Sequence, residues 1–93
     1  MKISYDPTKR AATLAARGLD MARVFEVFAG WHLTFDDKRF DYGEDRHLTF
    51  GYLDGRMVVF AWTHRDGTCR VISLRKANGR EQKRYEGRLG RPG

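Results

Sequence analysis

The stretch Met57-Val-Val-Phe-Ala-Trp-Thr63 decides the fold. It is almost wholly apolar and rich in β-branched and aromatic side chains, which is typical of a buried strand. Asp54-Gly55 precedes it and Asp66-Gly67 follows it. Asp-Gly pairs are typical of two-residue hairpin turns, because both turn positions take a positive φ. The stretch is therefore predicted to be the middle strand of an antiparallel meander.

The segments beyond these two turns continue the pattern. Residues 48–52 alternate between large apolar and smaller or polar side chains, and residues 68–75 carry three branched apolar side chains. Both are predicted strands. Residues 31–35 alternate as well and predict a fourth strand, whereas residues 36–45 hold five acidic side chains and predict a loop.

The N-terminal third predicts two short helices after a short strand over residues 2–5. Asp6-Pro7 is a helix start, since Asp caps the free N–H groups and proline needs no partner for its nitrogen. This helix is predicted to run from Pro7 to about Arg17 and to end at Gly18 as a left-handed cap. Its narrow apolar stripe consists of Ala11, Leu14 and Ala15.

The second helix is predicted to begin after Asp20 and to stop at Gly30. Its apolar residues stand at i, i+3, i+4 and i+7, which is the stripe of an amphipathic helix. They are Met21, Val24, Phe25 and Phe28. The two helices are expected to pack together as a hairpin.

A third helix is predicted after the meander. Asn78 and Glu81 have the spacing of a capping box. The resulting fold class is α+β, with two N-terminal helices on a three- to four-stranded antiparallel sheet and a basic C-terminal helix. The chain of 93 residues is long enough for one domain over 1–93, and we expect residues 87–93 to be a frayed tail.

The net charge of +6 is concentrated at one end of the chain. Residues 75–93 hold seven basic and two acidic side chains, whereas residues 1–74 are nearly neutral. A basic end attracts a polyanion, of which nucleic acid is the commonest in a cytoplasm. A solvated basic tail that keeps the protein soluble explains the charge equally well.

Composition also indicates a compartment. No apolar stretch has the length of a signal peptide or a membrane span, and Cys69 has no second cysteine to pair with. We therefore expect a cytoplasmic protein without a membrane partner. The scattered histidines and the cysteine have no metal-site spacing, so no metal or cofactor is expected.

Several motifs along the chain have a specific pattern. The opening has an aromatic-Asp-Pro-x-Lys helix start followed by a glycine, and the most specific match is an Ile-Ser strand leading to an Arg-Lys-Ala corner. The motifs are Tyr5-Asp6-Pro7-Thr8-Lys9 with Gly18, Met21 to Phe28, Glu44-Asp45-Arg46, Thr63-His64-Arg65, and Val71-Ile72-Ser73-Leu74-Arg75-Lys76-Ala77-Asn78 with Arg80-Glu81 and Tyr85. Together these motifs resemble the BrnT family of toxins, and the resemblance covers residues 3 to about 86. Thr13, Ala16 and Arg17 depart from it, since many relatives carry Asn and then Lys-His there.

The resemblance implies a RelE-like fold and cleavage of RNA without a metal or cofactor. It also implies inhibition of translation and neutralisation by a BrnA-like antitoxin with a ribbon-helix-helix domain. Operator DNA is then bound only through the toxin–antitoxin complex, which represses its own operon.

Metal-independent cleavage needs cations for the charge that develops on the phosphate when the 2′-OH attacks. Arginine suits this role because its planar fork matches phosphate oxygens and stays charged. Arg75 and Arg80 are our leading candidates, since they flank a strand-to-helix corner. Arg65 ranks lower, because it lies at the other end of the hairpin that ends in Arg75.

Cleavage also needs a base for the 2′-OH and an acid for the leaving oxygen. His64 and Tyr85 are the catalytic candidates. His47 is a further option, whereas Glu81 is expected to serve the capping box and His32 a structural role. We expect Tyr85, Phe60 and Trp62 to pack rather than to stack on bases, and Cys69 to be inert. The predicted RNA-binding residues are Lys9, Arg46, Lys76, Lys83 and Arg84.

The alternative is a non-catalytic nucleic-acid-binding module with a basic C-terminal helix. It accounts for the charge but not for the corner motif. A pure interaction protein, whose basic helix docks an acidic partner, is compatible with the toxin hypothesis.

Overall fold

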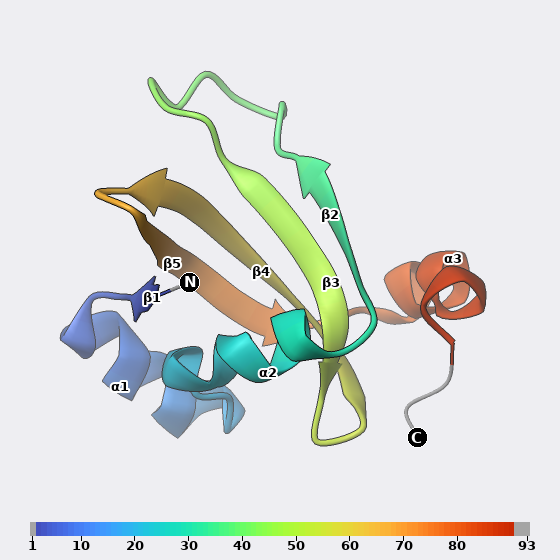
Figure 1. Ribbon diagram of the computed structural model, residues 1–93. Coiled ribbons are helices and arrows are strands. Elements are labelled where there is room, and N and C mark those ends of the chain that lie inside the picture. Colours follow the sequence, from blue (N-terminus) through green and yellow to red (C-terminus); the bar gives the residue numbers. More distant parts are fainter. Residues whose placement is uncertain (1, 91–93) are drawn as a thin grey trace.

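The computed structural model describes residues 2–90 and confirms the α+β class (Figure 1). The elements follow the predicted order: a short strand, then helices, four strands and a last helix. The elements are β1 (Lys2–Ser4), α1 (Pro7–Arg17), the 3-10 turn η1 (Met21–Arg23), α2 (Val24–Ala29), β2 (His32–Asp36), β3 (His47–Leu53), β4 (Arg56–Arg65), β5 (Thr68–Lys76) and α3 (Gly79–Leu89).

The sheet is larger than predicted. Five strands are present in the order β1-β5-β4-β3-β2, and β1 pairs with β5 in parallel. The prediction of a purely antiparallel sheet with three or four strands was therefore wrong. β1 is short, and no hairpin turn joins it to β5. The sequence therefore carries no local signal for that pairing.

Both Asp-Gly turns form as predicted. Asp54 and Gly55 have φ angles of 52° and 75°, and Asp66 and Gly67 have 51° and 73°. Positive φ at both central positions is the geometry whose twist matches the strands on either side. The turns thus set the meander β3–β4–β5.

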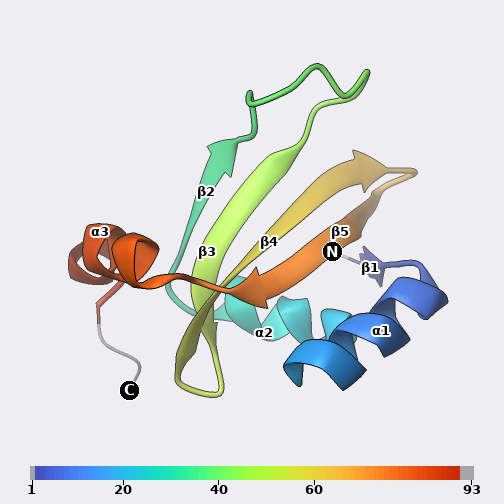
Figure 2. The same cartoon turned by 180° about the vertical axis from the view of Figure 1, so that it is seen from behind.

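Strand β4 is buried on both faces from Met57 to Thr63. Val58, Phe60 and Trp62 belong to the core under the N-terminal helices, while Met57 and Val59 belong to a second core under α3. Figures 1 and 2 show α1 with α2 and, apart from them, α3. The predicted burial of Phe60 and Trp62 is confirmed. The sheet is the layer that both groups of helices share.

The apolar stripe of the second helix differs from the prediction. Met21 and Val24 are buried as expected, but Phe25 is 56% exposed and Val27 is buried instead. The segment opens with a 3-10 turn, which has three residues per turn. The 3-10 turn places Val24 one turn after Met21 against the sheet, and Val27 follows within α2.

Helix α1 lies further out than its predicted stripe implies. None of its residues is buried, and Leu14 is 44% exposed. Polar contacts hold the helix: Arg10 pairs with Asp20 at 2.7 Å, and Nη1 of Arg17 donates to the Leu74 carbonyl at 2.8 Å. Gly18 ends it with φ 67°, as predicted.

Helix α3 continues beyond the point where we expected fraying. It runs to Leu89, which is buried, and the hydroxyl of Tyr52 donates to the Gly90 carbonyl at 2.6 Å. The expectation of a frayed tail is wrong for residues 87–89, because Leu89 anchors the last turn in the second core. Residues 91–93 lie outside the described residues.

A β-bulge in β5 changes which face its later residues occupy. The register shifts between Ala61 and Trp62, whose partners are Ser73 and Val71, so Ile72 has no partner of its own. An extra residue reverses the in–out alternation along the rest of a strand. Leu74 consequently joins Val71 in the first core, and Arg75 turns to the face that carries α3.

We predict that Gly51→Ala destabilises the fold. A Cβ at Gly51 would lie 2.4 Å from Cγ1 of Val27 and 3.2 Å from the Trp31 carbonyl oxygen. Overpacking of this kind costs about 1–3 kcal/mol. Urea unfolding is the measurement. Gly87→Ala is the control, because a Cβ there meets nothing within 4 Å and should add about 0.5–1 kcal/mol of stability. Equal stability of the Gly51 variant and wild type would contradict the close α2–β3 packing.

Candidate functional site

The corner between β5 and α3 places Arg75 beside the start of a helix. Ala77 is buried and its N–H donates to the Met57 carbonyl, which fixes the end of β5 against β4. Asn78 then caps α3 through the predicted capping box: its side chain accepts from the Glu81 N–H at 2.8 Å, and the Glu81 carboxylate accepts from the Asn78 N–H at 2.9 Å. The corner is therefore held from both sides.

Glu81 has a second role that the sequence did not reveal. Its two carboxylate oxygens accept from Nη1 and Nη2 of Arg75 at 2.8 and 3.0 Å. These hydrogen bonds lower the pKa of Glu81 and raise that of Arg75. Both groups therefore stay charged at neutral pH, and the guanidinium of Arg75 has a defined orientation.

The guanidinium of Arg75 keeps one bidentate edge open. Glu81 occupies the edge formed by Nη1 and Nη2, and among residues 2–90 no side chain occupies the edge formed by Nε and Nη2. Arg23 shows that one guanidinium can serve two oxyanions: Glu26 takes its Nε–Nη2 edge while Asp54 takes its Nη1–Nη2 edge. The Arg75 side chain is 41% exposed and lines a surface cavity.

Tyr85 lies on the same face of the sheet as Arg75. Arg75 is opposite Val59, whose other neighbour is Phe50, and the Tyr85 ring lies 4.5 Å from that of Phe50. The ring also packs on Phe35 at 5.4 Å. The predicted packing role of Tyr85 is confirmed, and Figure 2 shows α3 on this side of the strands.

Arg39 is a further cation near this corner that sequence reasoning missed. Its positive charge has a small effect on both partners: it helps to lower the pKa of Glu81 and slightly opposes the rise in the pKa of Arg75, which the Arg75–Glu81 hydrogen bonds dominate. Arg39 is held by Asp37, which is buried and accepts from its Nε and Nη2 at 2.8 Å each. Those bonds lower the pKa of Asp37 to about 2. Residues 36–45 were predicted only as a polar loop, because nothing local shows that the loop folds back.

The basic side chains of α3 are exposed, as their spacing predicted. Arg80, Lys83, Arg84 and Arg88 all reach solvent. Arg84 lies over the Tyr85 ring at 5.6 Å, and Arg88 lies over the Phe35 ring at 5.8 Å. Arg80 stands at the first turn of the helix. Arg84 and Arg88 thus place positive charge against the aromatic side chains that pack under α3.

Two of the predicted catalytic residues lie elsewhere. Arg65 pairs with Thr68 next to the Asp66-Gly67 turn, while Arg75 pairs with Val59, so the two arginines are at opposite ends of the hairpin as expected. Arg65 contacts Glu44 at 3.2 Å. His64 is on the opposite face, with its ring 4.8 Å from that of Trp62. One phosphate cannot meet Arg75 and His64 together.

His64 belongs to a second polar cluster with His47. Their ring centroids are 5.6 Å apart, and Nδ1 of His47 lies 3.2 Å from a carboxylate oxygen of Asp36. His32 is apart from them, and its Nδ1 lies 2.9 Å from the Gly30 carbonyl oxygen. Arg46 lines the same surface pocket as His47, so what sets this pair apart from Arg75 is its face of the sheet rather than a lack of cations.

The remaining predicted RNA-binding residues are dispersed. Arg46 stacks on the Tyr42 ring at 3.9 Å, Lys9 lies on α1, and Lys76 is exposed at the end of β5. Cys69 is fully buried, and this burial raises the pKa of its thiol to about 12. A thiol of that kind is protonated and inert at neutral pH, in agreement with our expectation.

Residues 2–90 contain no group of three or more His, Cys, Asp or Glu side chains arranged to hold a metal ion. None of the helices in that range combines the length and the apolar character that a membrane crossing needs.

The sequence profile described as "Ribonuclease toxin, BrnT, of type II toxin-antitoxin system" matches residues 5–81, which is more than four-fifths of the chain. The chain belongs to the BrnT family. A comparison with curated proteins gives no match. The match includes β5 and the corner up to Glu81, so Arg75 and its partner lie within the part that the family shares. The family is one of ribonuclease toxins of type II toxin–antitoxin systems, which implies an RNA target and an antitoxin partner for this BrnT protein.

We predict a pH-dependent loss of stability in Glu81→Gln. Glutamine keeps a hydrogen-bonding oxygen for Asn78 but loses the charge that holds Arg75. At pH 7 the cost should be about 0.5–1 kcal/mol, since both side chains are partly exposed. The pKa of Glu81 is lower in the folded state than in the unfolded state. The ion pair therefore stabilises the fold at pH values above the unfolded-state pKa of ~4.3, and this stabilisation is lost as the pH falls further. Thermal melts at pH 7 and pH 3 measure this, and a gap that does not shrink at pH 3 would contradict the ion pair.

Proposed function

We propose that this protein cleaves RNA without a metal ion, by attack of the 2′-OH on the adjacent phosphate, at the corner between β5 and α3. The observation that carries the proposal is the open Nε–Nη2 edge of Arg75 in a guanidinium whose other edge Glu81 holds. A pre-oriented guanidinium loses less freedom on binding a phosphate than a mobile one does.

The cations around the corner suit the charge of the transition state. Two non-bridging phosphate oxygens can accept from the open edge of Arg75 in a bidentate arrangement. Arg80 stands in the first turn of α3, and Arg39 contributes a positive charge to the same region. The N-terminal end of a helix adds further positive potential. Preorganised charge of this kind stabilises the phosphorane more than the starting phosphate.

Tyr85 is our candidate for proton transfer at this corner. Its ring is fixed between Phe50 and Phe35 on the face that carries Arg75. Glu81 is engaged by both Arg75 and Asn78, so it is less available as a base. His64 and His47 are on the other face and are left out of this mechanism.

The proposal extends to the partners that the family implies. We propose that a BrnA-like antitoxin with a ribbon-helix-helix domain neutralises the toxin, and that the complex represses its own operon. Translation is inhibited in the cytoplasm when the antitoxin is absent. Lys83 and Arg84 on the exposed face of α3 are proposed to contact the RNA backbone beyond the cleaved phosphate.

The test is cleavage of a single-stranded RNA by the purified protein in EDTA. We expect cutting that leaves 5′-OH ends. Arg75→Ala should lower the rate roughly 10²–10³-fold, with a smaller loss for Arg80→Ala. Both variants should still bind RNA, since each loses one of several phosphate contacts.

Lys2→Ala is the matched control, because it removes one exposed positive charge beside Thr68, at the opposite end of β5 from Arg75. It should cleave like wild type. Cleavage that stops in EDTA would contradict the metal-independent mechanism. If affinity fell equally with every charge removed and no fragment appeared, a non-catalytic binding module would be supported instead.

A further inference from the structure

The outer edge of β5 is covered over only part of its length. β1 pairs with Thr68 to Arg70, and within residues 2–90 no strand lies beside residues 71–76 on that side. The Leu74 carbonyl points outward, since it accepts from Arg17 rather than from β4. In an antiparallel pair both backbone groups of a residue point the same way, so the Leu74 N–H also faces outward.

A groove lies between this edge and α1. One wall comes from α1 residues at helical spacing, namely Lys9, Ala12, Thr13, Ala16 and Arg17. The other wall consists of Ile72, Ser73 and Leu74. The volume is about 400 Å³. Helix α1, which has no buried residue, thus forms one side of a groove along an open strand edge.

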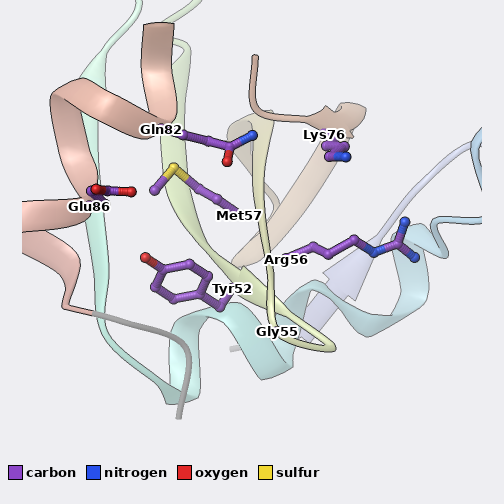
Figure 3. A pocket seen from close by; sticks show the side chains of 7 residues that line it. All are labelled: Tyr52, Gly55, Arg56, Met57, Lys76, Gln82 and Glu86. Carbon is purple, nitrogen blue, oxygen red and sulfur yellow. The ribbon is translucent and has the colours of Figure 1, made fainter. Parts of the chain in front are cut away.

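The groove continues around the end of the sheet. A second cavity of about 380 Å³ shares Arg17 with the first and is also lined by Arg56, Arg75 and Lys76. A third, of about 520 Å³, shares Arg56 and Lys76 with the second. Figure 3 shows this third cavity, in which Gln82 and Glu86 of α3 face Arg56 and Lys76 across Met57 and Tyr52. We call the three cavities together the edge groove.

The charged side chains that line the first two cavities of the edge groove are all basic. Their lining includes five basic side chains and no acidic one, above aliphatic side chains of the strands. The basic residues are Lys9, Arg17, Arg56, Arg75 and Lys76. A ligand that fits carries negative charge, apolar side chains and backbone groups able to pair with a strand edge.

We propose that the edge groove binds an extended acidic segment of the antitoxin, which adds to β5 as a strand and continues toward α3. The identity of the partner rests on the proposed function. Strand addition satisfies the open backbone groups, and alternate side chains of the segment reach the aliphatic floor and the basic rim. Arg17 then exchanges the Leu74 carbonyl for a carboxylate of the segment.

A peptide fits this groove better than RNA does. Single-stranded RNA is bound by aromatic side chains on which its bases stack. The first two cavities contain no aromatic side chain, and the hydroxyl of Tyr52 in the third is occupied by the Gly90 carbonyl. Basic side chains along a strand edge oppose pairing with an uncharged or basic strand, whereas an acidic strand neutralises them.

Because of the position of Arg75, a segment bound in the edge groove would also affect the proposed cleavage site. Arg75 lines the second cavity and also provides the open guanidinium edge of the proposed cleavage site. A carboxylate of the bound segment competes with phosphate for that edge. The partner would thus block the enzyme by occupying the same cation that the RNA needs.

The experiment uses the full chain and three labelled probes: an acetylated peptide of about ten residues that alternates valine and glutamate, its valine–lysine counterpart, and an RNA strand of similar length. Fluorescence anisotropy measures affinity. Only the acidic peptide should bind in the groove, and it should slow hydrogen exchange of the Leu74 amide. Ala16→Glu, which places an acid in the groove wall, should weaken its binding at least tenfold.

Ala15→Glu is the matched control, since Ala15 is exposed on the same helix but does not line the groove. It should bind the acidic peptide like wild type. Equal affinity of both variants, no saturable binding of the acidic peptide, or protection of the Leu74 amide by RNA instead would overturn the proposal. Both variants should still cleave RNA. The peptide-binding assay therefore tests the groove proposal, and the RNA-cleavage assay separately tests the proposed ribonuclease function.

Discussion

The structure depends on the burial of β4 on both of its faces. Successive residues of that strand supply two separate cores, with Phe60 and Trp62 under the N-terminal helices and Met57 and Val59 under α3. A large part of the stability of such a small domain comes from this shared strand, because burial of each large apolar side chain contributes about 1.5–3 kcal/mol. Polar groups inside it are satisfied, as where Nε1 of Trp62 donates to Thr49 at 2.8 Å.

At the corner after β5, one carboxylate both caps a helix and holds the arginine of the proposed cleavage site. Glu81 caps α3 through Asn78 and orients Arg75 through a bidentate ion pair. The helix start and the guanidinium are therefore positioned by the same group, and neither can shift without the other. On the proposed function, this ion pair would keep an exposed arginine rigid enough for electrostatic stabilisation of a transition state.

The β-bulge at Ile72 affects both the proposed cleavage site and the edge groove. It turns Arg75 toward α3, where Glu81 holds it, and it leaves Leu74 in the first core with its carbonyl directed at Arg17. The same strand thus presents a cation to one face and a partly unpaired edge to the other side. On our proposals, RNA uses the first and the antitoxin uses both.

The sequence by itself determined the meander, the helix caps and the family. Asp54-Gly55 and Asp66-Gly67 take the backbone angles that these residue pairs favour, and Asn78 with Glu81 forms the predicted box, because such signals act over a few residues. Only the tertiary structure decided that β1 joins the sheet in parallel, that Phe25 is exposed, that Arg39 approaches Arg75, and that His64 is on the face away from it. These outcomes depend on strand register, on one unpaired residue in β5 and on a loop that folds back. The physical reason is that such contacts join residues far apart in the chain, so no local pattern of side chains specifies them.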